Sequence, residues 1–297
     1  MLMMHGRRLL AGANKRATLY AHQVLSANSG TPDVHRQCST SSSDATPATS
    51  QPQKAALLII GAEILSGGIT DVNTPWLAKL LYSRGIDLVR AEVIPDDVSD
   101  IKATLLRLRQ VVGPTGMIFT SGGIGPTHDD VTYEAVAAAT GTTLQVHLPT
   151  KERMQVAYDK RGIELNASRL RMATLPTPSE VLFTEGSWVP LVCVDGVYIL
   201  PGIPKLFQSM IMGQQARFQG AAFCSAAVYT QMGEGDLAVA LTKVAAAHPK
   251  VSIGSYPNTG TPHPISEYKV KLAFSGAGPG RSDSSRGGRQ GSGPGRV

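Results

Sequence analysis

The residues best suited to chemistry form one stretch, residues 121–130, which reads Ser-Gly-Gly-Ile-Gly-Pro-Thr-His-Asp-Asp. Glycine has no side chain, so a phosphate can approach the backbone N–H groups of a glycine-rich turn closely. We therefore expect Gly122, Gly123 and Gly125 to bind a phosphate. The Thr127 hydroxyl either donates a further hydrogen bond to it or caps the helix that follows.

Two adjacent carboxylates, Asp129 and Asp130, end this stretch, and two interpretations of them stay open. Beside a bound phosphate they are well placed to hold Mg²⁺ or a similar divalent metal. At the entrance of a helix, a negative charge is also favoured by the helix dipole without any ligand. A glycine loop alone does not decide, because many α/β folds contain one.

The elements around this stretch predict an α/β fold. Residues 117–120 form an apolar strand before the loop, and residues 131–140 form a helix that Gly141 ends. Similar pairs precede it: strand 56–60 with a helix capped by Asn73, and strand 86–94 with a helix capped by Ser99. This alternation predicts a three-layer fold, in which a parallel sheet with right-handed crossovers is covered by helices on both faces.

Parallel strands also predict where the polar residues meet. The loops 61–73, 95–97 and 121–130 each follow a strand, so all three leave the sheet at its carboxyl edge, where ligands of such folds bind. We expect five polar residues to surround the glycine loop: Glu63, Asp71, Asn73, Asp96 and Asp97. The alternatives are a simple helix cap for Asn73 and an ordinary acidic turn for Asp96 and Asp97.

The rest of the chain divides into segments. Residues 54–220 form the main domain, which also contains helices at 151–161, 167–173 and 205–217 and a hairpin of strands 189–194 and 197–200 around Asp195-Gly196. Residues 221–275 read as a small α+β domain of β-α-β-β order, with strand 226–231, helix 236–247 and strands 251–256 and 265–274. Residues 276–297 are rich in Gly, Ser and Arg and are expected to be disordered.

Residues 1–53 resemble a targeting segment. The first part is basic and free of acidic residues up to Val24, and a stretch rich in Ser, Thr and Pro follows. That composition is typical of a mitochondrial or chloroplast transit peptide, with a cleavage site near residues 36–40. We expect mitochondrial localisation, with the chloroplast as the alternative. A disordered extension without targeting function remains the other interpretation.

Charge and cysteine content exclude several partners. The net charge of +6 lies in the two ends, because residues 54–275 carry 19 basic and 19 acidic residues. A folded nucleic-acid reader carries its positive field on the folded part, so we expect no nucleic acid, including at the Gly/Arg tail. Three cysteines without ligand spacing predict neither a zinc site nor a disulfide framework. No apolar stretch approaches the roughly 20 residues that span a bilayer, so no membrane association is expected.

These motifs together resemble the molybdopterin-binding (MoaB/Mog, CinA-like) domain family. The resemblance is carried by Gly-Ala-Glu-Ile-Leu-Ser-Gly at 61–67, Pro-Asp-Asp at 95–97, the loop at 121–130 and Pro-Gly-Ile-Pro at 201–204. It is greatest to the N-terminal molybdopterin-binding region of eukaryotic FAD synthase and the small domain after it, and it covers residues 54–275.

The resemblance implies a function and its residues. Asp130 corresponds to an aspartate that acts with a divalent metal, and Glu63 is the second catalytic candidate. The implied ligand contacts are Gly61, Asn73, Asp96, Gly122, Gly123, Gly125, Thr127, Pro201 and Gly202. Relatives form dimers or trimers, so a homo-oligomer is implied as well. One departure is Ala62, where the family usually has an acidic residue.

Two functions follow from this resemblance. The first is a metal-dependent hydrolase that binds a small pterin or nucleotide and cleaves the pyrophosphate of FAD or ADP-ribose. The second is a non-catalytic binding module that serves FAD or molybdenum-cofactor metabolism. The domain that makes FAD in FAD synthase is not expected within these 297 residues.

The targeting interpretation predicts import. A reporter that carries residues 1–50 is expected to enter an organelle, because a basic, acid-poor and Ser-rich start is what import receptors bind. Microscopy and N-terminal sequencing of the processed protein, which we expect to begin near Ser39, measure this. A reporter that stays in the cytosol with its first residues intact would support the simple extension instead.

Overall fold

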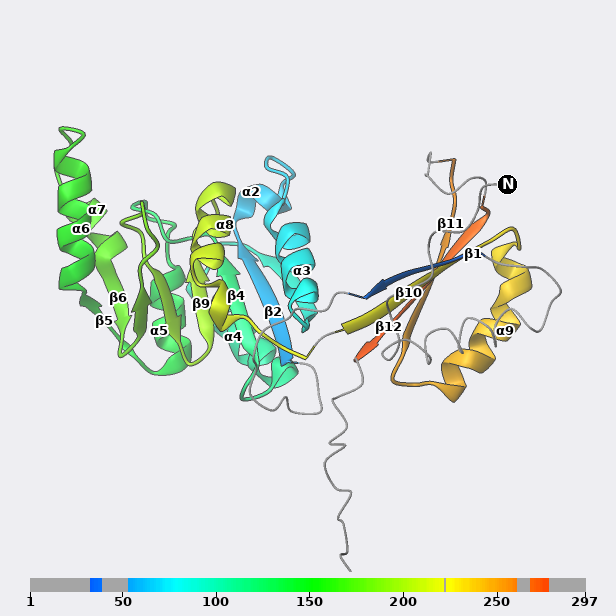
Figure 1. Cartoon of the computed structure of the whole chain (residues 1–297). Coiled ribbons are helices and arrows are strands. Elements are labelled where there is room, and N and C mark those ends of the chain that lie inside the picture. The colour runs from blue at the N-terminus through cyan, green and yellow to red at the C-terminus, as the bar shows by residue number, and fades with distance from the viewer. Residues whose placement is uncertain (1–32, 39–52, 222, 261–267, 278–297) are drawn as a thin grey trace, which may run out of the picture. The chain divides into compact units, whose positions relative to one another are not determined.

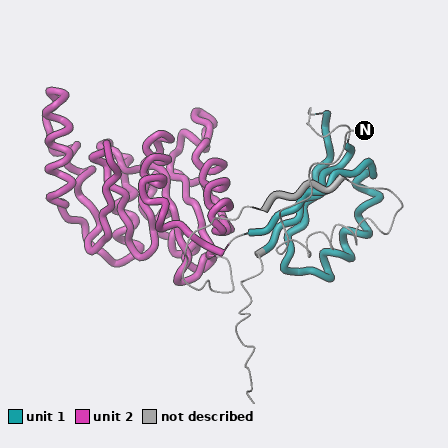
Figure 2. The backbone as a smooth tube through the Cα atoms, in the orientation of Figure 1, with its two compact units in different colours: residues 1–50, 222–297 teal, residues 51–221 magenta. Residues whose placement is uncertain are grey.

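The computed structural model describes residues 33–38, 53–221, 223–260 and 268–277 (Figure 1). The chain divides into two compact units (Figure 2). The larger unit contains residues 51–221, and the smaller unit combines residues 1–50 with residues 222–297.

A six-stranded sheet forms the centre of the larger unit, with the strand order β3-β2-β4-β9-β8-β7. Its members are β2 (Gln53–Ile60), β3 (Ile86–Ile94), β4 (Met117–Ser121), β7 (Glu180–Leu182), β8 (Leu191–Val194) and β9 (Val197–Leu200). The first four strands in this order run parallel to one another, as predicted. β8 and β7 continue the sheet antiparallel, because β8 and β9 form a hairpin around Asp195 and Gly196, both at positive φ.

Helices cover both faces of this sheet (Figure 1). One face packs against α3 (Asn73–Ser83) and α8 (Pro204–Gly213), and the other against α4 (Val98–Val112) and α5 (Thr132–Thr140). Strand β2 shows why both faces must be covered, because its residues 55–60 are all buried. Their side chains point alternately into the hydrophobic core on one face of the sheet and into the core on the other face. A strand buried on both faces reads as a continuous apolar run. The predicted three-layer α/β fold is confirmed.

The periphery of the larger unit holds elements that the sequence predicted only in part. They are α2 (Ala62–Leu65), β5 (Thr143–Val146), α6 (Leu148–Asp159), α7 (Ala167–Leu170), β6 (Thr174–Thr177) and two short 3-10 helices, η1 (Arg171–Ala173) and η2 (Gln215–Arg217). β5 and β6 form a separate antiparallel pair that was not predicted. All four residues of β5 are exposed, so no buried alternation marks it as a strand.

In its described residues, the smaller unit consists of a four-stranded antiparallel sheet in the order β1-β10-β12-β11 and one helix. Its elements are β1 (Asp33–Cys38), β10 (Phe223–Thr230), α9 (Glu234–Ala247), β11 (Ser252–Pro257) and β12 (Val270–Ala277). Val228, Leu237 and Leu272 lie at the centre of its core. The β-α-β-β order appears as predicted, but the last strand begins later than residue 265 and reaches Ala277.

Strand β1 contradicts the expected disorder of residues 33–38, and cleavage near Ser39 would remove this strand from the sheet. It pairs with β10 from Asp33 opposite Tyr229 to Cys38 opposite Cys224. The two strands are far apart in the chain, and no local pattern in Asp-Val-His-Arg-Gln-Cys predicts a strand. Residues 276 and 277 of the tail expected at 276–297 belong to β12, whereas residues 278–297 and most of the expected targeting segment lie outside the described residues. Among the residues that are described, no helix has the length and apolarity that crossing a bilayer requires.

The turn between α3 and β3 contacts the end of the larger unit. The Gly220 N–H donates to the Arg84 carbonyl at 2.8 Å. Gly85 has φ +73°, and a Cβ added to it would lie 2.0 Å from the Ala221 carbonyl oxygen. Glycine is therefore required here for two reasons, the positive φ and the close backbone approach.

These two reasons predict different costs for two substitutions. Gly141→Ala, at φ +70° and ψ +22° with nothing within 4 Å of the added Cβ, is expected to lower the free energy of unfolding by about 1–2 kcal/mol. Gly85→Ala adds the collision with residue 221 and is expected to cost about 3 kcal/mol or more. Urea unfolding of both variants measures the difference, and equal costs would contradict the proposed backbone contact.

Candidate functional site

Backbone hydrogen bonds fix the glycine loop between β4 and α5. The Gly122 N–H donates to the Leu200 carbonyl at the end of β9, at 3.1 Å. Thr132, the first residue of α5, donates from its N–H to the Gly123 carbonyl and from its hydroxyl to the Gly122 carbonyl, both at 2.9 Å. The loop is therefore held before any ligand arrives.

The glycines of the loop are required by close contacts as well as by access. Gly122 has φ +113°, and an added Cβ would lie 2.1 Å from the Ile60 carbonyl oxygen. At Gly123, with φ +65°, the added Cβ would lie 2.3 Å from the Thr132 hydroxyl oxygen. At Gly125 it would lie 2.6 Å from Oδ2 of Asp130. The sequence predicted these positions for phosphate access, and the packing is a second and independent reason for them.

Asp130 is held by the loop that it belongs to. Its Oδ2 accepts hydrogen bonds from the Thr127 N–H at 2.8 Å and from the Thr127 hydroxyl at 2.5 Å. Arg171 of η1 donates to the Thr127 carbonyl at 2.8 Å and to the Asp130 carbonyl at 3.2 Å. Neither prediction for Thr127 describes this role, because its hydroxyl neither lines the cavity nor caps α5. Arg171 was not predicted, since it follows the loop by about forty residues without a local signal.

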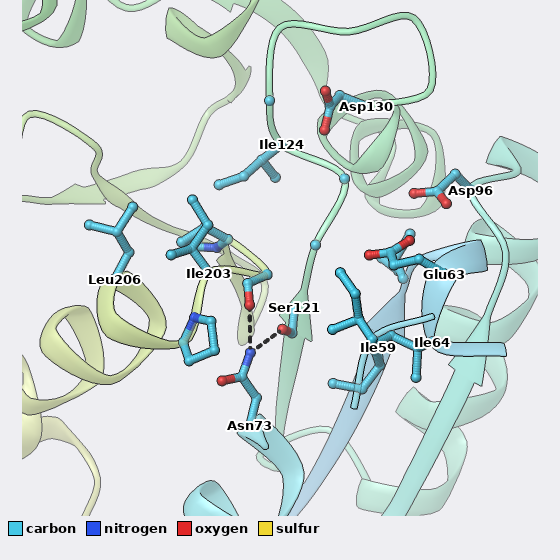
Figure 3. A pocket seen from close by; sticks show the side chains of 18 of the residues that line it. Ile59, Glu63, Ile64, Asn73, Asp96, Ser121, Ile124, Asp130, Ile203 and Leu206 are labelled. Carbon is cyan, nitrogen blue, oxygen red and sulfur yellow. Dashed lines mark hydrogen bonds between the residues drawn. The ribbon is translucent and has the colours of Figure 1, made fainter. Parts of the chain in front are cut away.

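Asn73 connects three segments rather than capping a helix. Its side-chain amide donates to the Ser121 hydroxyl at 3.0 Å and to the Gly202 carbonyl at 2.9 Å, and the residue is only 4% exposed (Figure 3). The capping role falls to Asp71, whose Oδ1 accepts from the N–H groups of Asn73 at 2.9 Å and Thr74 at 3.1 Å. The start of α3, the end of β4 and the loop after β9 are thereby joined.

A cavity of about 580 Å³ lies at this edge of the sheet, within the size range of small-molecule sites. Eleven of the predicted residues line it: Glu63, Asp71, Asn73, Asp96, Gly122, Gly123, Gly125, Asp129, Asp130, Pro201 and Gly202. Gly61, like Thr127, does not line it, and its N–H donates to the Ile94 carbonyl at 3.0 Å instead. Asp97 is also outside, because it caps α4 by accepting from the Asp100 N–H at 2.8 Å, the role predicted for Ser99.

Carboxylates dominate the charge of the cavity. Glu63, Asp96 and Asp130 stand together on one side of the glycine loop (Figure 3), and Asp71 and Asp129 line the cavity too. Burial raises the pKa of Asp96, and the charges of Glu63, Asp129 and Asp130 raise it further, against the N–H of Ala62, which donates to Asp96 at 3.1 Å. The lining contains no Lys, Arg or His side chain. A phosphate bound here therefore meets no cationic side chain of the lining.

The carboxylates suit a hard divalent cation. Mg²⁺ prefers oxygen ligands and keeps several of its waters, so it needs only one or two carboxylates. Hydrogen bonding within the loop lowers the pKa of Asp129 and so favours its charged form. Over the described parts of the chain, however, no three His, Cys, Asp or Glu side chains stand close enough to hold a metal together. Any metal would be held by fewer side chains, with water or ligand oxygens completing its shell.

Several residues that line the cavity were not predicted. Met172 and Trp188 come from segments that precede and follow β6 and β7, and Leu206 comes from the start of α8, two residues after the predicted loop 201–204. Their side chains are apolar, and from the sequence alone an apolar residue is expected to belong to the hydrophobic core and not to a binding site. Only the folded chain brings them to the glycine loop.

Known proteins resemble both units. Residues 56–215 match the family model "Probable molybdopterin binding domain", and residues 222–284 match "FAD synthase, middle domain". A "Probable FAD synthase" of Caenorhabditis elegans is 31% identical over 237 residues, which are 71% of this chain and 45% of that protein. A "CinA-like protein" of Anaeromyxobacter dehalogenans is 32% identical over 158 residues, 52% of this chain and 38% of that protein. The chain spans less than half the length of these two relatives.

A solved structure resembles the larger unit. The CinA protein of Thermoplasma acidophilum has 27% sequence identity and a TM-score of 0.49, and the match covers 56% of this chain and 98% of that chain. The family model carries the assignment, since it matches more than half of the sequence, including the glycine loop and the loop at 201–204. The chain belongs to the molybdopterin-binding domain family, and its molybdopterin-binding domain is followed by a domain of the FAD synthase middle type.

Proposed function

We propose that the cavity binds a phosphate-bearing pterin or a flavin or adenine dinucleotide, and that the chain cleaves the pyrophosphate of a dinucleotide such as FAD or ADP-ribose with a divalent metal. One observation carries this proposal: the glycine loop shares a cavity with five carboxylates, and no cationic side chain lines it. An anionic ligand would be repelled there unless a cation enters with it.

The residues divide the work as follows. The backbone of residues 123–125 binds the phosphates near the entrance of α5, where the helix dipole favours negative charge, since the Gly122 N–H donates to Leu200. Asp129 and Asp130 would hold the metal, and the bonds from Thr127 fix Oδ2 of Asp130. The metal, when bound, would neutralise and polarise the phosphoryl oxygens.

The cleavage itself needs one water molecule. Water attacks one phosphorus, the bond from that phosphorus to the bridging oxygen breaks, and the bridging oxygen leaves with the other phosphate. Glu63, which lines the cavity beside Asp96, is placed to accept the proton that the attacking water loses. Two monophosphates result, so AMP is one product of both FAD and ADP-ribose.

A second candidate is a binding module without turnover. Ala62 stands where related sequences carry an acidic residue, and its backbone N–H donates to Asp96. The described residues also offer no set of three metal-ligating side chains. Both observations favour retention of the ligand with loss of the chemistry, and release of AMP separates the two candidates.

Asp130→Asn is expected to lower pyrophosphate cleavage by about 100-fold or more, while ligand affinity changes little. The substitution removes the charge that would hold the metal but keeps an oxygen for the two bonds from Thr127. AMP release and calorimetric binding, each with Mg²⁺, Co²⁺ or EDTA, give the two readouts.

The matched control for this experiment is Asp87→Asn. Asp87 is exposed near the start of β3, at the opposite end of that strand from the cavity. It should leave cleavage unchanged. Tight binding without AMP release in the wild type, under every metal condition, would establish the module and reject the hydrolase.

Asp96→Asn is expected to stabilise the metal-free protein at neutral pH. In the folded state the pKa of Asp96 is raised by burial and by neighbouring carboxylates, so the folded protein binds more protons than the unfolded chain between the ordinary pKa and the raised one. The stability of the wild type therefore falls as the pH rises through that window, and the variant avoids this loss.

Thermal unfolding at neutral and acidic pH, with EDTA or Mg²⁺, measures the effect. The advantage of the variant should shrink as the pH falls through the raised pKa, and Mg²⁺ should stabilise the wild type more than the variant. A lower melting temperature for the variant at neutral pH in EDTA would contradict the repulsion between the carboxylates.

A further inference from the structure

The cavity has an apolar side opposite its carboxylates. Ile124, Ile203 and Leu206 lie across the glycine loop from Glu63 and Asp96 (Figure 3). Other apolar side chains complete the lining, among them Ile69, Val72, Met172, Trp188 and Val189. One cavity thus combines an anionic, backbone-lined side with a side built from large apolar groups.

Several of these apolar side chains are exposed to solvent. Ile203 is 61% exposed, Ile69 is 56% exposed and Val72 is 45% exposed. Single exposed apolar residues are common on protein surfaces, but three around one concavity mark a place that a ligand or partner covers. Because they belong to the same cavity as the glycine loop, the group that covers them is part of whatever the loop binds.

Trp188 is the largest and flattest apolar residue of the lining. It is half-buried in the segment between β7 and β8, and the ring of Tyr158 from α6 packs against it at 5.9 Å between ring centroids. The Arg169 guanidinium lies 5.6 Å from the Tyr158 ring in turn. A side chain braced in this way loses little freedom when a ligand stacks on it.

We propose that the apolar side binds the planar heteroaromatic ring of the ligand and that Trp188 is its stacking partner. This inference rests on the proposed function for the phosphate end of the site. It narrows the ligand class to compounds that join such a ring to phosphate, and it excludes inorganic pyrophosphate and simple sugar phosphates as tight ligands.

The charge of the cavity supports this class. A site that binds bare phosphates tightly gains most of its affinity from cationic side chains. The lining here contains none, so the ring contacts must supply affinity that the charges do not. Stacking of a base on an aromatic side chain is worth about 5- to 150-fold in affinity by alanine substitution.

The test compares ligands with and without a ring on the full chain. FAD, FMN, ADP and inorganic pyrophosphate are titrated calorimetrically in Mg²⁺ against the wild type, Trp188→Ala, Trp188→Phe and Trp188→Leu. The control variant is Trp76→Phe, because Trp76 packs edge-on against Phe207 and does not line the cavity.

Ring-bearing ligands are expected to bind Trp188→Ala and Trp188→Leu at least 5-fold more weakly, and Trp188→Phe nearly as well as the wild type. Pyrophosphate, already weak, should not distinguish the variants, and Trp76→Phe should match the wild type. The FMN and ADP titrations show whether a flavin or an adenine ring occupies the apolar side. If Trp188→Ala fails to fold, the comparison of Phe with Leu carries the same information.

Three results would overturn the inference. The first is equal affinity of ring-bearing ligands for the wild type and the Leu variant. The second is an equal loss for pyrophosphate and for the ring-bearing ligands, which would make Trp188 a structural residue. Failure of the wild type to bind any of the four ligands would overturn the proposed function and this inference together, whereas binding without AMP release rejects the hydrolase alone.

Discussion

Four strands of the larger sheet run in the same direction, and the site depends on that constraint. β2, β3, β4 and β9 are parallel neighbours, so the loops after them leave the sheet at one edge. The amide of Asn73 then joins two of these loops to α3 with a pair of buried hydrogen bonds. A buried amide whose bonds are broken costs more than the bonds themselves contribute, so this arrangement holds the edge in one geometry.

The same constraint explains how much could be predicted. Glu63, Asp96 and Asp130 were expected to converge because each follows a strand, and strand direction follows from the alternation of strands and helices. Arg171 and Trp188 reach the site from later segments, which no period or spacing relates to the loop. The cap at Asn73 was wrong because the helix already begins at this residue, and Asp71, two residues earlier, accepts from its first two N–H groups.

The acidic side of the cavity is unfavourable when empty of cations and useful when one is present. The cost of holding negative charge in this cavity is clearest at Asp96, whose pKa is raised both by burial and by neighbouring carboxylates. A site that stores such repulsion gains affinity for a cation in proportion to the repulsion relieved.

The pairing of β1 with β10 has a consequence for synthesis of the chain. The larger unit is inserted between these two strands, so a ribosome completes all of residues 51–221 before β1 has its partner. Pairing of such distant segments is slow, and an unpaired strand that waits is a site of aggregation. The sequence of β1, Asp-Val-His-Arg-Gln-Cys, is mostly polar and carries both signs of charge. Such a sequence suits a strand that must stay solvated and unaggregated until β10 has been made and can pair with it.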